Sequence, residues 1–254
     1  MKSKIWAATA MGLLAIALSA PVATAQLCGS YPGMMIKFDR DAWAYETAYN
    51  ATTLISTSGS QLTVVGTVSK FCFPFTDLNP ADPSTEYTFI WDGLISQGTT
   101  SAAYLVTGRK YTTNYTGGNF RIFAGSTRNA PADSTLPALP APGTVPDAFV
   151  DGTMILSGSM GPLTVVVTRV PTGSYSGTFR ADYWNTGGTL YGRVGDAASL
   201  LAGAWCVVPP ISPSPIGTCS LPTGWSAHPN GKWNMPLTVP ALPSTWGKIK
   251  SMYR

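Results

Sequence analysis

The stretch FIWDGLISQGTTSAAYLVTGRKYTTNYTGGNFRIFAG, residues 89–125, decides the fold class. Its aromatic and β-branched residues are interspersed with polar ones, and the pairs Asp92-Gly93 and Gly117-Gly118 interrupt the run. Threonine, valine, tyrosine and phenylalanine favour strands, and Asp-Gly or Gly-Gly pairs between them favour hairpin turns. The stretch therefore predicts an antiparallel β-meander with turns at these two pairs.

A second stretch, residues 149–185, repeats the order of the first. Both contain an Asp-Gly pair, a second glycine, a run ending in Val-Thr, and a tyrosine followed by Phe-Arg. This order predicts two copies of a strand, hairpin, strand unit. The alternative is that proteins rich in glycine and threonine resemble themselves by composition. Both interpretations make the two stretches β-meanders.

The motifs Tyr115–Arg121 and Phe149–Gly158 resemble segments of exported bacterial β-rich proteins that carry no assigned activity. The resemblance covers about residues 85–190 and rests on short motifs. It implies an extracellular β-sandwich. It transfers no site residues.

The flanking segments complete the predicted fold. Residues 34–38 read as a strand, and Asp39 as the N-cap of one short helix that runs to Glu46. Five prolines in residues 128–146 exclude regular structure there. The segment is either a linker between two domains or a long connection across one β-structure, and the second is favoured because strand edges in copies this short would need each other as cover. The predicted architecture is all-β and β-sandwich-like over residues 26–208, with an irregular, proline- and tryptophan-rich, disulfide-held segment at 209–254.

The first 25 residues, MKSKIWAATAMGLLAIALSAPVATA, read as a cleavable secretory signal peptide. Lys2 and Lys4 precede an uncharged run, and a small-residue triplet ends at Ala25. The run is shorter than the roughly 20 residues that a membrane-spanning helix needs. Cleavage before Gln26 and a secreted or periplasmic location are therefore expected, with no transmembrane segment in the mature chain.

Charge and composition limit the partners. Charged residues make up 11% of the chain, against about 25% in ordinary soluble domains. The formal charge is +4, which becomes +2 without Lys2 and Lys4. Apart from a short terminal run at 248–254, the linear sequence has no basic cluster, so neither nucleic acid nor an anionic membrane is an expected partner.

Four cysteines, Cys28, Cys72, Cys206 and Cys219, lie in the mature part. An even number in an oxidising compartment predicts two disulfides. Three pairings exist, and the one favoured joins the neighbours in sequence, Cys28 with Cys72 and Cys206 with Cys219. A metal site is not expected, because the chain has no C-x-x-C pair and a single histidine.

Histidine-dependent catalysis would have to use His228, which lies in a segment that reads as a turn, and the chain has no G-x-S-x-G motif. A glycosidase needs two carboxylates roughly 5 to 10 Å apart. The chain has twelve acids, Glu46 and Glu86 among them, but most lie in turns and predicted caps. No catalytic residue is assigned.

Two ligand classes remain as hypotheses. Calcium could use oxygen ligands from Asp39 and Asp41, or from Asp147 and Asp151, although no EF-hand spacing is present. Otherwise no cofactor is expected. Aromatic rings in a weakly charged β-protein favour sugar stacking, and Tyr183 and Trp184, between Asp182 and Asn185, are the candidate stacking residues.

These features predict an exported, non-catalytic interaction or structural protein at the cell surface or outside the cell. Its expected partner is a glycan or another cell-surface component. One alternative is a hydrolase that acts on polysaccharide through a carboxylate pair. The other is a self-assembling matrix or fibre subunit, which exposed strand edges would permit.

Overall fold

A computed structural model describes residue 28 and residues 33–38, 42–131, 147–171, 175–196, 198–207, 221 and 224–235. The chain divides into two units, Met1–Pro32 and Gly33–Arg254, and the whole sheet lies in the second. The predicted signal peptide and Cys219 lie outside the described residues, as do most of the segments 128–146 and 209–254.

The described part of the chain is all-β, as predicted. It forms one antiparallel sheet of twelve strands and a separate two-stranded hairpin. The strands of the large sheet are β1 (Met34–Phe38), β2 (Ala42–Glu46), β5 (Gln61–Thr67), β6 (Lys70–Phe71), β7 (Glu86–Tyr104), β8 (Gly108–Thr116), β9 (Asn119–Gly125), β10 (Thr153–Met160), β11 (Leu163–Arg169), β12 (Tyr175–Gly187), β13 (Ala198–Cys206) and β14 (His228–Asn234). The hairpin is β3 (Tyr49–Asn50) with β4 (Ile55–Ser56), and two short 3-10 turns are η2 (Asp147–Phe149) and η3 (Tyr191–Arg193).

Several short strands are halves of longer ones. β9 pairs with the first part of β7 and β8 with its last part, so that β8 and β9 together run antiparallel to β7. In the same way, β10 runs along β9 and β11 runs along β8. The thirteen-residue strand β12 pairs with β10 at one end and with β11 at the other. The break between β8 and β9 is Gly117-Gly118, which lies opposite Gly93, and all three glycines have positive φ.

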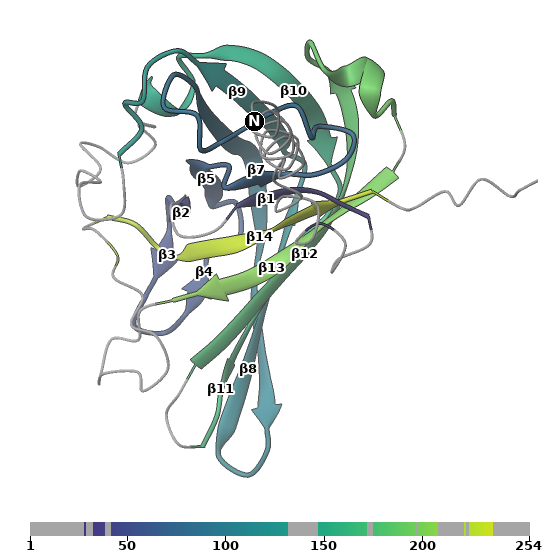
Figure 1. The fold of residues 1–254 in the computed structure, drawn as a ribbon. Coiled ribbons are helices and arrows are strands. Elements are labelled where there is room, and N and C mark those ends of the chain that lie inside the picture. The colour runs from purple at the N-terminus through teal and green to yellow at the C-terminus, as the bar shows by residue number, and fades with distance from the viewer. Residues whose placement is uncertain are drawn as a thin grey trace, which may run out of the picture. The chain divides into compact units, whose positions relative to one another are not determined.

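The sheet curves into a partly closed ring (Figure 1). From β12 the pairing continues through β13 and β14 to β1, and β1 pairs with β6, which follows β5 in the chain. β2 pairs with β5, and a bridge between Ala44 and Ala227 joins β2 to the residue before β14. Among the described residues the ring is therefore partly closed. β1 pairs with β14 on one side and with the two residues of β6 on the other, and a single bridge joins β2 to Ala227.

The described strands form this single, partly closed sheet in place of the predicted β-sandwich. A sandwich and a closed meander have the same alternation and similar turn spacing, so the sequence pattern does not separate them. The turns predicted at Asp92-Gly93 and Gly117-Gly118 are also wrong. Asp92 and Gly93 lie inside β7, and the chain keeps its direction from β8 through Gly117-Gly118 into β9. The second stretch folds into β10, β11 and β12. Each stretch is one long antiparallel hairpin with one interrupted arm, formed by β8 and β9 in the first and by β10 and β11 in the second. Their origin by duplication stays a prediction.

The predicted helix over residues 39–46 is wrong, because residues 42–46 form β2. All five residues of β2 are buried. Ala44 belongs to the core inside the ring, whereas Trp43 and Tyr45 belong to a second cluster outside it. A strand buried on both faces loses the polar alternation that marks a strand in sequence, which explains the error.

Aromatic side chains fill the inside of the ring. Phe38 lies 4.9 Å from Phe89 and 4.8 Å from Trp233 between ring centroids. Phe179 lies 5.6 Å from Trp91, and all these rings are 0–3% exposed. Each such side chain contributes about 1.5–3 kcal/mol through burial. The part of the interior that these rings occupy is therefore a packed core.

The second cluster covers the outer side of β2, β5, β7 and β9. Trp43 packs edge-on against Phe149 of η2 at 6.2 Å and lies 6.3 Å from Trp225. The Thr88 hydroxyl donates to the Phe149 carbonyl at 3.0 Å and holds η2 on the sheet. Part of the predicted irregular C-terminal segment is thus ordered, with Trp225 packed on the outside of the ring.

The C-terminal segment also contributes β14, which lies between β13 and β1. The prediction that residues 209–254 are irregular throughout is therefore wrong for 228–234. His228 begins this strand rather than a turn, and its ring packs edge-on against Trp43 at 6.2 Å. None of the helices in the described residues has the length and apolar character needed to cross a membrane.

The cysteine prediction is confirmed for one pair. Cys28 and Cys72 form a disulfide. Cys206 is also disulfide-bonded, and its predicted partner Cys219 lies outside the described residues. Both observations agree with the oxidising compartment that the cysteine count predicts.

Candidate functional site

The outward face of β12 carries the strongest candidate site. Side chains of this strand alternate strictly, with Phe179, Ala181, Tyr183 and Asn185 buried inside the ring. The intervening residues point outward and are exposed: Thr178, Arg180, Asp182, Trp184 and Thr186. Because successive outward side chains on a strand are roughly 7 Å apart, this row forms an extended polar strip with an aromatic ring in it.

A groove of about 440 Å³ lies along this strip. Its walls come from β12 and from the neighbouring strand β11, together with Pro162 before β11. The lining residues are Pro162, Thr164, Val166, Thr178, Phe179, Arg180, Ala181 and Asp182. This volume is within the range of about 300–1,000 Å³ that is usual for small-molecule sites.

The groove offers a guanidinium, a carboxylate and two hydroxyls. Thr164 pairs with Arg180 across the two strands, and its hydroxyl donates to Oδ1 of Asn114 at 2.9 Å. Arg180 supplies donors only and ionised Asp182 acceptors only, while hydroxyls can do both. Hydroxyl-rich ligands need such a mixture of donors and acceptors.

Trp184 lies outside the set of residues that line the groove, two residues beyond Asp182 on the same face of β12. It is 39% exposed. A Cβ at position 161 would lie 3.2 Å from atoms of its indole ring, so glycine at this position leaves the ring room to lie against the backbone. The Gly161 amide donates to the Asp182 carbonyl at 2.8 Å, which ties this backbone to β12.

Tyr183, the other predicted stacking residue, points the opposite way. It is 0% exposed and packs edge-on against Phe120 at 5.1 Å. Burial also raises the pKa of its hydroxyl. Its ring has no face open to a ligand, because adjacent residues of a strand point to opposite sides of the sheet.

A polar cluster inside the ring is the site that sequence reasoning missed. Glu46 ends β2 and is 6% exposed. Its carboxylate accepts hydrogen bonds from the hydroxyls of Ser56 and Tyr115, the latter at 2.9 Å. Ser56 in turn shares a hydrogen bond with Ser96 of β7. The alternation of β2, with Ala42, Ala44 and Glu46 on one face, is the signal that could have placed this acid inside.

Burial raises the pKa of the Glu46 carboxyl, although the hydrogen bonds from Ser56 and Tyr115 oppose that shift. Burial and the nearby Glu46 charge likewise raise the pKa of the Tyr115 hydroxyl. The adjoining cavity, with Tyr49, Tyr111 and Trp205 in its wall, has a volume of about 20 Å³. That is room for about one water molecule, so the cluster is part of the core rather than a site for a large ligand.

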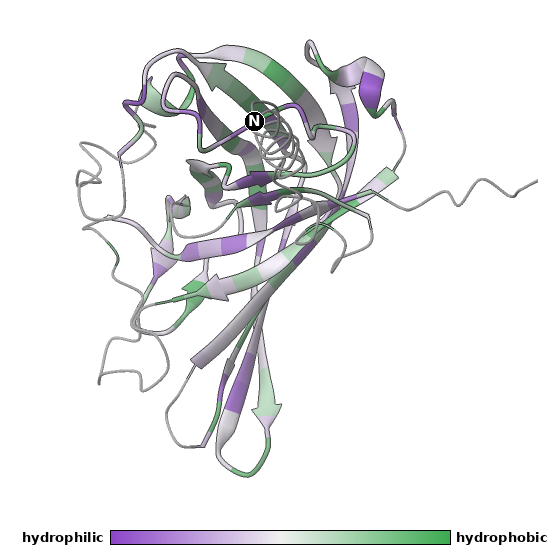
Figure 2. Cartoon of the chain, in the orientation of Figure 1, coloured by the Kyte–Doolittle hydropathy of each residue, from purple (hydrophilic) through white to green (hydrophobic). Residues whose placement is uncertain are grey.

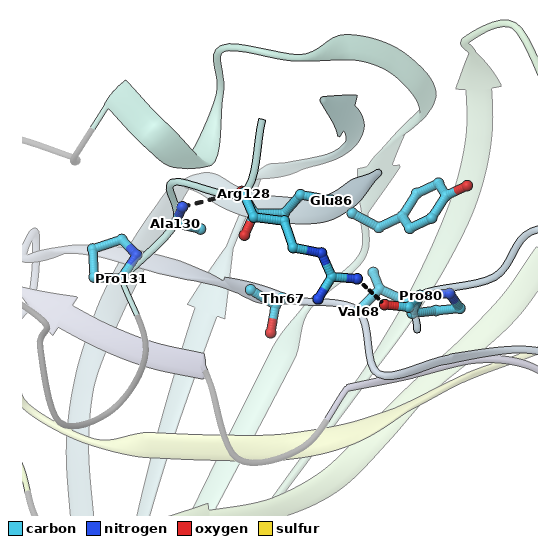
Figure 3. Close-up of a pocket in the computed structure, with 8 residues that line it drawn as sticks. Thr67, Val68, Pro80, Glu86, Arg128, Ala130 and Pro131 are labelled. Atoms are coloured by element: carbon cyan, nitrogen blue, oxygen red, sulfur yellow. Dashed lines mark hydrogen bonds between the residues drawn. The ribbon is translucent and has the colours of Figure 1, made fainter. Parts of the chain in front are cut away.

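A third cavity, of about 290 Å³, lies beside the start of β7 (Figure 3). Glu86 accepts hydrogen bonds from the amides of Asn129 and Ala130 at 3.1 and 3.0 Å. Arg128 donates to the carbonyls of Pro80 and Asp82, both at 2.6 Å. These charged groups hold two loops together, which accounts for them without a ligand.

The residues proposed for calcium are not brought together in the described structure. Asp39 and Asp41 lie outside the described residues. Asp147 begins η2, and Asp151 accepts a hydrogen bond from the Asn129 side chain at 2.7 Å. The described residues contain no cluster of three or more acidic, histidine or cysteine side chains that could hold a metal ion. Calcium binding stays a prediction.

Comparison of the chain with protein-family models, with curated proteins and with solved structures finds no match.

Proposed function

We propose that this protein is an exported, non-catalytic carbohydrate-binding protein whose site is the groove along β11 and β12. The observation that carries the proposal is the outward row of β12, where Trp184 lies in line with Asp182, Arg180 and Thr178 beside the groove. An indole face stacks on the apolar side of a sugar ring, and the charged and hydroxyl groups bond to its hydroxyls.

The carboxylates near the groove favour binding without turnover, because they do not form a facing pair. A glycosidase needs a second carboxylate facing the first across the bond to be cleaved. Among the described residues that line the groove, Asp182 is the one carboxylate. Glu46 lies inside the ring, where its hydrogen bonds come from hydroxyls, and Asp92 forms an ion pair with Arg121.

The closure of the sheet bears on the fibre alternative. That hypothesis rested on exposed strand edges, which add strands from other copies. In the ring, β1 and β6 pair with each other, and β14 pairs with both β1 and β13. The edges of β1 and β14 are thus used within one chain, which weakens the argument for assembly through those two edges. Among the described residues β6 pairs with β1 alone, and β2 has one bridge besides its pairing with β5.

A glycan array probed with the mature protein tests the proposal, followed by calorimetric titration and a hydrolysis assay on each glycan that binds. We expect binding to an extended, hydroxyl-rich glycan and no release of product. Release of reducing sugar would favour the hydrolase instead. Failure to bind across a broad panel of plant, bacterial and animal glycans would refute the proposal.

A further inference from the structure

One hairpin extends past the rest of the partly closed sheet. Beyond Ile95, where the pairing with β5 ends, β7 continues to Tyr104, and β8 returns from Gly108 in register with it. Figure 1 shows β8 and β11 running down and away from the other strands towards this end. The turn that joins β7 to β8, residues 104–108, lies at the end of this arm.

The turn is apolar and uncovered. Tyr104 is 39% exposed, Leu105 66% and Val106 95%. The described residues include seven exposed large hydrophobic side chains, and three of them are these consecutive ones. Leu105 has a φ of +54°, a conformation in which glycine or asparagine costs less than a branched side chain. Leu105 therefore occupies a position where both exposure to water and the backbone conformation disfavour an apolar, branched side chain.

Cations lie directly behind the turn. Arg109 and Lys110 begin β8, and the register of the sheet sets Arg169 of β11 opposite Arg109. All three side chains are exposed. Figure 2 shows the apolar turn in green and a hydrophilic stretch of β8 in purple behind it. The pairing of β8 with β11 thus sets Arg109 beside Arg169 on one face of the arm, while Lys110 lies on the other face. Together the three cations form a basic cluster around the arm from residues that are far apart in sequence.

No acid offsets this cluster on its own strands. Residues 95–116 and 163–180 contain no Asp or Glu. Like charges directly opposite each other destabilise a sheet, so the Arg109–Arg169 pair has a cost that an external anion would remove.

We infer that the β7–β8 turn docks on an anionic lipid surface, with Leu105 and Val106 entering the interface and the three cations at the level of the headgroups. Tyrosine is enriched at membrane interfaces, and basic residues beside an inserted apolar segment are attracted to anionic lipids. A three-residue turn is far smaller than the roughly 800 Å² per partner of a stable protein interface, which disfavours a second copy as the occupant. This inference does not depend on the carbohydrate groove.

The experiment is cosedimentation of the mature protein with vesicles of phosphatidylcholine alone and of phosphatidylcholine mixed with phosphatidylglycerol. We expect binding to the mixed vesicles that weakens as salt is raised. Lys110→Gln and Arg169→Gln should each lower the partition coefficient about 5-fold. Lys70→Gln, an equal loss of charge on β6, is the matched control and should have a much smaller effect.

Leu105→Asp combined with Val106→Asp should abolish binding, whereas Met154→Asp, an equally apolar-to-acidic change at an exposed position of β10, should not. Unchanged thermal unfolding of each variant shows that the fold is intact. Equal binding to both kinds of vesicle, or retention by the double variant, would overturn the inference. So would concentration-dependent dimerisation that only the double variant abolishes, because the occupant would then be a second copy.

Discussion

The two faces of β12 differ in what they do, although their residues alternate along one strand. The inward residues Phe179 and Tyr183 are 3% and 0% exposed and pack among the aromatic rings inside the partly closed sheet. The outward residues Asp182 and Trp184 are exposed beside a groove. If the proposed function is correct, one strand separates stability from recognition by side-chain direction alone. Substitutions on the inward face should therefore lower stability, and substitutions on the outward face should lower binding while leaving stability unchanged.

The largest expected effect is on the inward face. Phe179→Ala should lower the free energy of unfolding by about 3–5 kcal/mol, because it removes contacts with Phe38, Trp91 and Trp205 and leaves a cavity. Urea unfolding without reductant measures the loss. Thr178→Ala, on the outward face, is the control and should change stability by less than about 0.5 kcal/mol. A loss below about 1 kcal/mol for Phe179→Ala would contradict the packed interior.

The inward polar cluster should make stability depend on pH. Burial raises the pKa of Glu46, so the folded state holds this proton more tightly than the unfolded state does. Stability from this group is present at low pH and is lost as pH rises from the unfolded value of 4.5 towards the raised one. Unfolding free energies measured between about pH 5 and about pH 8 should fall for the wild type.

Two variants sharpen that pH measurement. Glu46→Gln should remove this part of the slope, since the amide does not titrate. Tyr115→Phe removes a hydroxyl that donates to the carboxylate and should steepen the slope by raising the pKa of Glu46 further. An identical slope in the wild type and Glu46→Gln would show that this carboxyl does not titrate as its burial requires.

A smaller effect is expected at Asn185, the last inward residue before the end of β12. It is 1% exposed, and among the described residues neither atom of its side-chain amide has a hydrogen-bond partner. Asn185→Leu should raise the free energy of unfolding by about 1 kcal/mol, because an unsatisfied buried amide is replaced by an apolar group. A marked destabilisation in the same urea assay would mean that the amide is bonded in solution.

The sequence predicted the fold class but not its topology. Alternation in residues 89–125 and 149–185 was sufficient for an all-β prediction, because the strands there have one apolar and one polar face. Closure depends on pairing between β14 and β1, which are separated by almost the whole described chain, and local patterns carry no information on such pairing. β2 was missed because burial on both faces removed its alternation.

Ligand stacking by Trp184 stays a prediction; the structure shows that its side chain is exposed. Tyr183 is buried, because adjacent residues of a strand point to opposite faces, and the sequence prediction did not apply that two-residue period. The groove itself could not be read from sequence, because Thr164 and Arg180 meet only through the register of β11 and β12. The basic cluster behind the β7–β8 turn was hidden for the same reason, since Arg109 and Arg169 become neighbours only in the folded sheet.

The central claim is that Trp184 binds ligand without supporting the fold. The most direct test is calorimetric titration of a glycan selected on the array against the wild type, Trp184→Ala, Trp184→Phe and Met154→Ala. Met154 is the matched control, because it has the same 39% exposure elsewhere on the sheet. We predict that Trp184→Ala weakens binding at least about 10-fold, that Trp184→Phe and Met154→Ala retain most of it, and that all unfold within about 0.5 kcal/mol of the wild type. Unchanged affinity in Trp184→Ala, with the fold intact, would contradict the account.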